Sequence, residues 1–304
     1  MAALRRRRRL SLAGAALLGA ALVGARPARA QLTFPGAAPI SSGNVIIRTQ
    51  PELIDSTNGV HSILDKNIAI YGASPDLAFI LQSTSFIANS ANVVGPGGRS
   101  FQATAAGLGD TLLEARYTVY QVDGVGSTFR IAPYIGVSMP TGMDNVNSDI
   151  GRAGQPGSGT WGSRNALTMT YAELRWNGGA EFGYQANSAD AGYRFGNTFY
   201  ADAGVHYLLW PTTLETGVPS AELYASLEAN WTNQVANRAA GMNVPGTGGQ
   251  LLTIDPGLIY TRRLYSLSFT ALLPALEHVR DNGARLNYGG ILFFRYSLFT
   301  PYHW

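Results

Sequence analysis

Apolar and polar side chains alternate along many short segments of this chain. In residues 127–139, for example, Phe129 and Ile131 fall on one face of an extended segment, and Arg130 and Tyr134 fall on the other. Successive side chains of a β-strand point to opposite sides, so this period of two predicts strands with one apolar and one polar face. The alternation recurs in further segments: 197–209, 220–231 and 264–274.

Two architectures produce such strands, a soluble sandwich and a transmembrane barrel. The segments run to about ten residues, the length that a tilted strand needs to cross a bilayer, whereas strands of soluble proteins average about five to six. Aromatic residues lie near segment ends, as in the interfacial girdles of membrane barrels: Tyr120, Trp176, Trp210, Trp231, Tyr260 and Phe299. We therefore predict an all-β fold, an up-and-down antiparallel transmembrane β-barrel.

The connections predict about twelve strands, with ten and fourteen as alternative counts. The predicted strands are 44–53, 63–72, 76–87, 108–120, 127–139, 167–176, 180–187, 197–209, 220–231, 250–261, 264–274 and 286–299. Reading 167–187 as one strand gives eleven, but Asn177-Gly178-Gly179 is a strong hairpin signal. A turn there gives an even count, with both termini in the periplasm. Among the longer links, 88–107 and 140–166 are expected outside.

Composition and charge exclude several classes of protein. Charged residues make up 13% of the 304 residues, about half the usual fraction of about 25% in soluble domains. There is no cysteine, hence no disulfide and no thiolate metal site. The net charge of +3 comes from seven arginines in the first 30 residues, and without them 15 basic and 19 acidic residues leave −4. We therefore expect no nucleic-acid partner.

The N-terminal segment has the layout of a secretory signal. Arg5 to Arg9 form a positive region, Leu10 to Val23 an apolar region, and Ala28-Arg29-Ala30 a cleavage site. The predicted organisation is a signal peptide (1–30), a periplasmic N-terminal segment (31–43) and a transmembrane barrel (44–304). Export through the periplasm predicts a location in the outer membrane of a Gram-negative bacterium, with membrane lipids around the barrel.

The last strand carries a pattern of its own. Residues 288–294, YGGILFF, resemble the signal that barrel-assembly machinery recognises on a C-terminal strand, so this machinery is an expected partner. The terminal aromatic of that signal would be Phe299 or Trp304, since a short tail follows Phe299.

Several segments, taken in order, resemble a known family: Asn67–Phe86, Gly109-Asp110 with Leu112–Tyr120, Ile131–Gly142, Leu223–Trp231 and Asp255–Pro274. The chain is similar to the outer-membrane barrels named after the phenol meta-degradation pathway, a group assigned to transport. The resemblance implies a barrel that passes or binds small, hydrophobic or aromatic compounds. It implies no particular functional residues.

Candidate functional residues are those that alternation places on the inner face, because lumen side chains tune selectivity in barrels. The charged set is Glu114, Arg116, Arg130, Glu173, Arg175, Glu181, Asp202, Glu222, Glu228, Asp255 and Arg295. These groups would either set the selectivity of a pore or pair with one another and fill a narrow barrel. Inward aromatic rings would stack on a solute or fill volume: Tyr134, Tyr200, Tyr224 and Phe293. We also expect Glu114 and Arg130 to be diagonal neighbours.

Enzyme chemistry has little support in the sequence. His206 shares a face with Asp202 and would be the candidate base, but the four histidines lack metal-ligand spacing. We predict no catalysis, no metal and no cofactor, and interpret His206 as a polar lumen residue. Two functions remain: a channel or transporter for small, hydrophobic or aromatic molecules, and a non-transporting barrel that anchors, senses or scaffolds.

Overall fold

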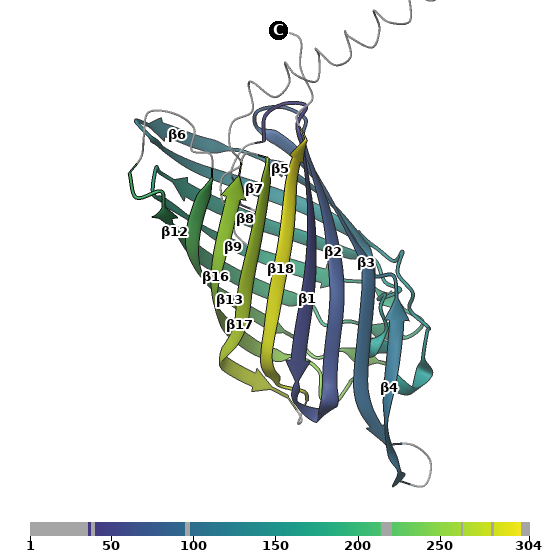
Figure 1. The fold of residues 1–304 in the computed structure, drawn as a ribbon. Coiled ribbons are helices and arrows are strands. Elements are labelled where there is room, and N and C mark those ends of the chain that lie inside the picture. The colour runs from purple at the N-terminus through teal and green to yellow at the C-terminus, as the bar shows by residue number, and fades with distance from the viewer. Residues whose placement is uncertain are drawn as a thin grey trace, which may run out of the picture.

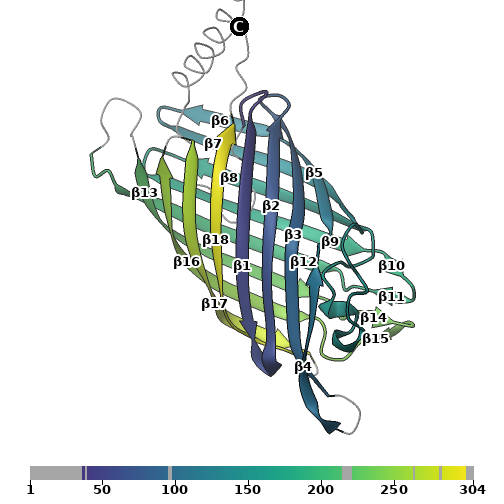
Figure 2. The same cartoon turned by 45° about the vertical axis from the view of Figure 1, so that its right-hand side comes forward.

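The computed structural model describes residues 36–37, 40–94, 98–213, 221–262, 264–280 and 283–298. These residues form a closed antiparallel β-barrel with strongly tilted strands (Figures 1 and 2). The predicted signal peptide and the terminal aromatics Phe299 and Trp304 lie outside the described residues. Among the residues that are described, no helix has the length and apolar character to cross a membrane.

The strands of the wall, in chain order, are β1 (Val45–Ser56), β2 (Val60–Gly72), β3 (Leu77–Val94), β4 (Ser100–Gly107), β5 (Thr111–Tyr117), β6 (Tyr120–Gly124), β7 (Ser127–Met139), β8 (Gly162–Ala172), β9 (Trp176–Asn187), β12 (Thr198–Trp210), β13 (Glu222–Gln234), β16 (Gly249–Arg262), β17 (Tyr265–Val279) and β18 (Leu286–Leu298). Each pairs antiparallel with its neighbours, and β1 pairs with β18 to close the ring.

The barrel has twelve strand positions, as predicted. Strands β4 and β5 both pair with β3, and β5 and β6 both pair with β7, so these three short strands share one position. The end where β1 begins and β18 ends carries short turns such as 73–76, and we assign it to the periplasm because outer-membrane barrels keep their short turns there. The longer loops at the other end then face outside.

The predicted division of 167–187 is confirmed, but its predicted turn is wrong. Strand β8 ends at Ala172 and β9 begins at Trp176. The amide of Glu173 donates to the carbonyl of Trp176 at 2.7 Å, a turn closure that needs no glycine. Asn177 and the two glycines after it are paired within β9 instead. Consequently Glu173 and Arg175, predicted in the lumen, lie in the turn, with Glu173 exposed and Arg175 half-buried.

Two other predicted boundaries need correction. Segment 88–107, expected as a loop, continues as the β3–β4 hairpin, which projects from the outer end of the barrel (Figure 1). The predicted strand 108–120 is broken, because β5 ends at Tyr117 and β6 starts at Tyr120. The loops 188–197 and 235–248 contribute the short strands of a second sheet at the same end (Figure 2): β10 (Ala189–Asp190), β11 (Tyr193–Arg194), β14 (Arg238–Ala239) and β15 (Met242–Asn243).

The predicted faces of the strands are confirmed. Ile135, Leu227 and Phe269 are exposed on the outside of the wall, at 66%, 51% and 57%. Glu228 and Ser268, one residue away along their strands, are buried inside. Leu, Tyr, Val and Phe dominate the exposed large hydrophobic residues, as expected for a surface that meets lipid.

One polar cluster interrupts this apolar surface. Asp65 lies on the outer face of β2, because its neighbours Lys66 and Ile68 line the lumen. Its carboxylate accepts hydrogen bonds from Thr49 of β1 at 2.8 Å and from Ser85 of β3 at 2.9 Å, so its oxygens have partners on both neighbouring strands. Internal hydrogen bonds of this kind are what a polar group needs where water is absent.

Candidate functional site in the barrel lumen

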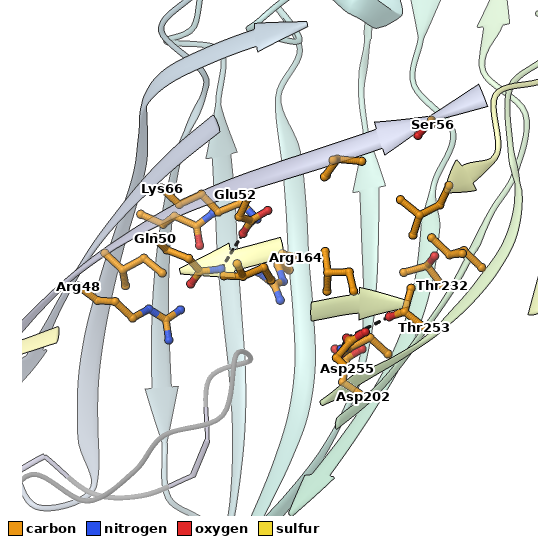
Figure 3. Close-up of a pocket in the computed structure, with 18 of the residues that line it drawn as sticks. Arg48, Gln50, Glu52, Ser56, Lys66, Arg164, Asp202, Thr232, Thr253 and Asp255 are labelled. Atoms are coloured by element: carbon orange, nitrogen blue, oxygen red, sulfur yellow. Dashed lines mark hydrogen bonds and ion pairs between the residues drawn. The ribbon is translucent and has the colours of Figure 1, made fainter. Parts of the chain in front are cut away.

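A cavity of about 560 Å³ occupies the barrel lumen (Figure 3). One part of its lining is apolar and comes mainly from β1, β2, β3, β16, β17 and β18: Ile54, Ile68, Ile70, Ile80, Leu251, Leu272, Leu286 and Ile291. The other part is charged: Arg48, Glu52, Lys66, Glu114, Arg164, Asp202, Asp255 and Glu277. The cavity is therefore amphipathic, with a size typical of small-molecule sites, about 300–1,000 Å³.

Arg164 on β8 is the cation of the central network. Its Nη2 lies 3.2 Å from Glu181 Oε1, and its Nε lies 3.8 Å from Glu114 Oε1. Both glutamates are almost fully buried. A buried carboxylate needs a cation and hydrogen bonds to offset its lost hydration, and Arg164 supplies a cation to both glutamates and a hydrogen bond to Glu181.

A glycine allows Glu114 to reach Arg164 from a strand that is not adjacent to β8. The register pairs Glu114 with Gly136 on β7, and Gly136 with Arg164. A Cβ atom at Gly136 would lie 2.6 Å from Cγ of Glu114, a distance that would push the carboxylate aside. The missing side chain on β7 thus opens the path between the two charges.

Two tyrosines complete the network. The phenol oxygens of Tyr134 and Tyr200 lie 3.2 Å apart, and Arg164 Nε donates to Tyr200 at 2.8 Å. Tyr134 also hydrogen-bonds Glu181. The Arg164 guanidinium carbon lies 4.9 Å from the centroid of the Tyr200 ring and 5.7 Å from that of Tyr134, within cation–π range.

Acidic residues gather on β12, β13 and β16. Asp202 and Asp255 line the cavity, and the Asp255 carboxylate accepts hydrogen bonds from Thr253 at 3.0 Å and from Asn230. Glu228 lies opposite Asp255 in the register. Figure 3 places Asp202 and Asp255 together, on the far side of the cavity from Arg48 and Lys66.

Basic residues lie on β1 and β2. Lys66 Nζ lies 2.7 Å from Glu52 Oε1, which also accepts a hydrogen bond from Gln50 at 2.6 Å. The Arg48 guanidinium lies 5.5 Å from the ring centroid of Phe293. With the acids opposite, the lumen carries a charge separation across its width, an arrangement that orients and selects polar solutes in a narrow pore.

His206 lies outside this cavity, although a Ser, a His and an acid lie close together here. His206 Nε2 is 3.7 Å from Glu228 Oε1, and Ser226 is directly opposite His206 in the register. None of the three lines the cavity, and His206 has no exposed surface. A solute in the cavity therefore has no contact with this group.

The segment before β1 enters the periplasmic end of the barrel. The amide of Ala37 donates to Thr170 Oγ1 at 2.8 Å, and Arg116 donates to the carbonyl of Gly36. Ile40 packs in a buried cluster with Ile68, Ile70, Ala78 and Ile80. Gly36, Ala37 and Ile40, which belong to the segment 31–43 predicted as periplasmic, thus lie inside the periplasmic end of the barrel and narrow that end of the lumen.

The structure places the predicted lumen residues in three groups. Glu114, Asp202 and Asp255 line the cavity. Others are buried in the networks around it: Arg116, Tyr134, Glu181, Tyr200, His206, Tyr224, Glu228, Phe293 and Arg295. Arg130 and Glu222 are half-buried toward the periplasmic ends of their strands. None of the four inward aromatics lines the cavity; Tyr224, for example, packs against Leu208 and Ile259.

The predicted contact between Glu114 and Arg130 is wrong. Glu114 lies opposite Gly136, six residues along β7 from Arg130, which pairs instead with Gln121 of β6. Arg130 Nη2 lies 3.9 Å from Asp123, on the same hairpin. The break between β5 and β6 moves the hairpin away from Glu114, and this break is not visible in the alternation of residues 108–120.

Sequence reasoning missed three cations of the cavity: Arg48, Lys66 and Arg164. Arg164 fell in a predicted loop, because β8 begins at Gly162 rather than at 167. A signal was present, since Arg164, Ala166 and Thr168 continue the alternation of the strand. Arg48 and Lys66 lie in predicted strands whose inner face was not assigned.

The sequence places the chain among known proteins. Residues 53–273 match the model of a family described as "Putative MetA-pathway of phenol degradation". The chain belongs to this family. No curated protein matches it in sequence. The barrel fold of this chain is the one that the resemblance to this family implied.

One solved structure shares the barrel fold of this chain. The COG4313 outer membrane channel from Pseudomonas putida F1 is similar with a TM-score of 0.59 and 13% identity, over 88% of this chain and 100% of that chain. The β domain of the Bordetella autotransporter BrkA gives a TM-score of 0.42 and 14% identity, over 85% and 100%. The protein is an outer-membrane β-barrel surrounded by lipid.

Proposed function

We propose that this barrel is a channel for small molecules that combine an apolar, typically aromatic, body with a polar group. The observation that carries the proposal is the lumen cavity of about 560 Å³ with its divided lining. Isoleucine side chains from β1, β2, β3 and β18 offer apolar contact to a ring, worth about 25 cal/mol per Å² of apolar surface removed from water. The charged side offers partners to a hydroxyl or carboxylate group.

The comparisons support this proposal. The family description refers to phenol degradation, and the Pseudomonas putida protein is described as an outer membrane channel. A phenol has a six-carbon ring and one hydroxyl, a combination that suits an amphipathic cavity better than a wet, fully charged pore. We expect no catalysis, since the buried group around His206 has no access to the cavity.

The alternative is a non-transporting barrel. It is favoured by the residues that narrow the periplasmic end, Gly36, Ala37 and Ile40, and by the ion pairs around Arg164. Conductance in planar bilayers separates the two functions. Reproducible single-channel steps are expected from a channel, and a sealed barrel would give none.

Solute flux tests the proposed substrate class. Proteoliposomes containing the folded protein should admit phenol faster, relative to glucose, than the same vesicles without protein. Ile291→Thr replaces the ethyl branch of a cavity-lining side chain by a hydroxyl and should lower the phenol-to-glucose ratio about fifteenfold, the effect of two apolar carbons. The matched control is Ile63→Thr, on the outer face of β2, where the side chain is 51% exposed. Equal ratios in both variants and the wild type would contradict the apolar route.

Assembly is a separate proposal. We infer that β18, which contains the sequence YGGILFF, presents the signal for the outer-membrane assembly machinery. Its pairing with β1 closes the ring.

A further inference from the structure

A second pocket, apart from the lumen cavity, lies among the outer loops. It has a volume of about 360 Å³ and is bounded by the 188–197 loop, the 235–248 loop and the end of β17. We propose that this pocket binds a phosphorylated sugar. The phosphate would contact three arginines, Arg194, Arg238 and Arg280, and the sugar the side-chain amide of Asn243.

The register brings two of these arginines together. Arg194 on β11 is directly opposite Arg238 on β14. Like charges at directly opposed positions destabilise a sheet, so an anion between them would remove a repulsion that the empty pocket retains. Arg280, at the end of β17, adds a third positive charge, and no acidic residue is among the described residues that line the pocket.

Two arginines of this pocket, Arg238 and Arg280, differ from three basic residues near the lumen and its outer mouth, and the third, Arg194, donates to the carbonyl of Asn187 at 3.0 Å. Lys66, Arg152 and Arg164 each have an acidic partner within 3.2 Å. Within the part of the chain that the structure describes, the side chains of Arg238 and Arg280 form no ion pair or hydrogen bond. Asp190, the acid nearest in sequence to Arg194, is bound by Arg152 at 2.8 Å.

The pocket rests on a rigid base. Asn237 is buried, and its side chain accepts a hydrogen bond from the amide of Gly196 and donates one to Tyr193, both at 2.8 Å. The backbone N–H of Asn237 donates to Thr247 Oγ1 at 3.1 Å. These bonds tie the two loops together, so the backbone beneath the arginines is fixed before a ligand arrives, which lowers the entropic cost of binding.

The chemistry of the lining selects the ligand. Planar guanidinium groups bind phosphate oxygens through paired, charge-assisted hydrogen bonds. The volume suits a small molecule more than a bare ion, and asparagine amides both donate to and accept from hydroxyl groups. A phosphorylated sugar has both features. It can come from a dissolved sugar phosphate or from the headgroup of a phosphorylated glycolipid in the outer leaflet.

Binding to the folded, detergent-solubilised protein tests the proposal. Calorimetry would use glucosamine 1-phosphate as the dissolved probe and glucosamine, which lacks the phosphate, as its counterpart. Retention of lipid A from mixed micelles would probe the glycolipid source. Arg238→Gln should weaken binding of the phosphorylated probe about tenfold, the usual loss when a charged hydrogen bond is removed. Arg99→Gln, an exposed arginine on the β3–β4 hairpin, should leave binding unchanged.

Each outcome decides the proposal. Arg238-dependent binding of glucosamine 1-phosphate supports the pocket and a dissolved ligand. Arg238-dependent retention of lipid A without binding of the dissolved probe supports the pocket and a glycolipid source. Absence of binding to both probes, or affinities that stay equal in the wild type and the Arg194→Gln/Arg238→Gln variant, would overturn it. Unchanged heat-induced mobility on gels would establish that the variants are folded.

Discussion

Tyr134 and Tyr200 stand on β7 and β12, with two strands between them, yet their phenol oxygens lie 3.2 Å apart. The positions between them in the register are Ala166 and Gly183. Because these two residues are small, the rings can lean toward each other across the inner wall. The contact thus depends on residues that take no part in the hydrogen bond.

Gly183→Ala tests this dependence. A Cβ atom at Gly183 would lie 2.1 Å from Cζ of Tyr200, so the ring must move and lose its bonds to Tyr134 and Arg164. We expect a loss of about 1–3 kcal/mol in the free energy of unfolding, as for other overpacked sites. Gly290→Ala is the control, since its nearest neighbour would be 3.9 Å away. Urea unfolding monitored by gel mobility measures both, and equal stability of the two variants would contradict the packing argument.

Arg164→Gln should destabilise the barrel more strongly. The change leaves two buried carboxylates, Glu114 and Glu181, without their shared cation. Breaking a buried pair costs about 3–5 kcal/mol. The double variant Arg164→Gln/Glu181→Gln removes one of the stranded charges and should recover part of that loss. If the double variant unfolds at the same urea concentration as the single variant, the ion pair is not the source of the effect.

Leu227→Arg tests whether the outer surface of β13 faces lipid. Leu227 lies near the middle of β13, exposed on the lipid-facing side. A charge near the bilayer midplane costs about 2–4 kcal/mol in outer-membrane barrels. Leu227→Ala removes the side chain without adding a charge and should cost much less, since the site is open. The free energy of unfolding of both variants would be measured after refolding into lipid vesicles. Comparable losses of stability for Leu227→Arg and Leu227→Ala would place Leu227 away from the membrane.

The alternation of apolar and polar residues predicted which side chains face the lumen and which face outward. The faces of β7, β13 and β17 follow directly from alternation, and the strand count follows from the connections. The turn at Glu173 was missed because a backbone hydrogen bond closes it without a glycine. Arg164 was missed because β8 begins at Gly162, before the apolar positions from which the strand was predicted to start at 167. Contacts across several strands, such as Glu114 with Arg164, depend on register and on small residues between them, and neither is visible in a single segment.

Tyr193 should make the outer loops sensitive to alkaline pH. Burial is the main cause that raises the pKa of Tyr193 above its ordinary value of about 10. Because the pKa of Tyr193 is higher in the folded loops than in the opened loops, the phenol loses its proton at a lower pH when the loops are open. The folded loops are therefore fully stabilised below about pH 10 and lose stability relative to the opened loops as the pH rises further. Proteolysis within 188–197 should therefore accelerate above pH 10 in the wild type. Tyr193→Phe, which cannot ionise, should show no such acceleration; the same pH response in both would exclude this tyrosine.

The contacts of Gly36 and Ala37 set an order of events during biogenesis. Their partners, Arg116 and Thr170, belong to β5 and β8, which come much later in the chain. The contacts of Gly36 and Ala37 are therefore complete only when β8 has emerged and paired, whereas the contacts of Ile40 lie on β2 and β3, which come earlier in the chain. The N-terminal segment is then enclosed when β18 pairs with β1, or it enters the closed barrel afterwards from the periplasmic side. A bulky group fused directly before Gly36 would therefore hinder the enclosure of this segment in the barrel.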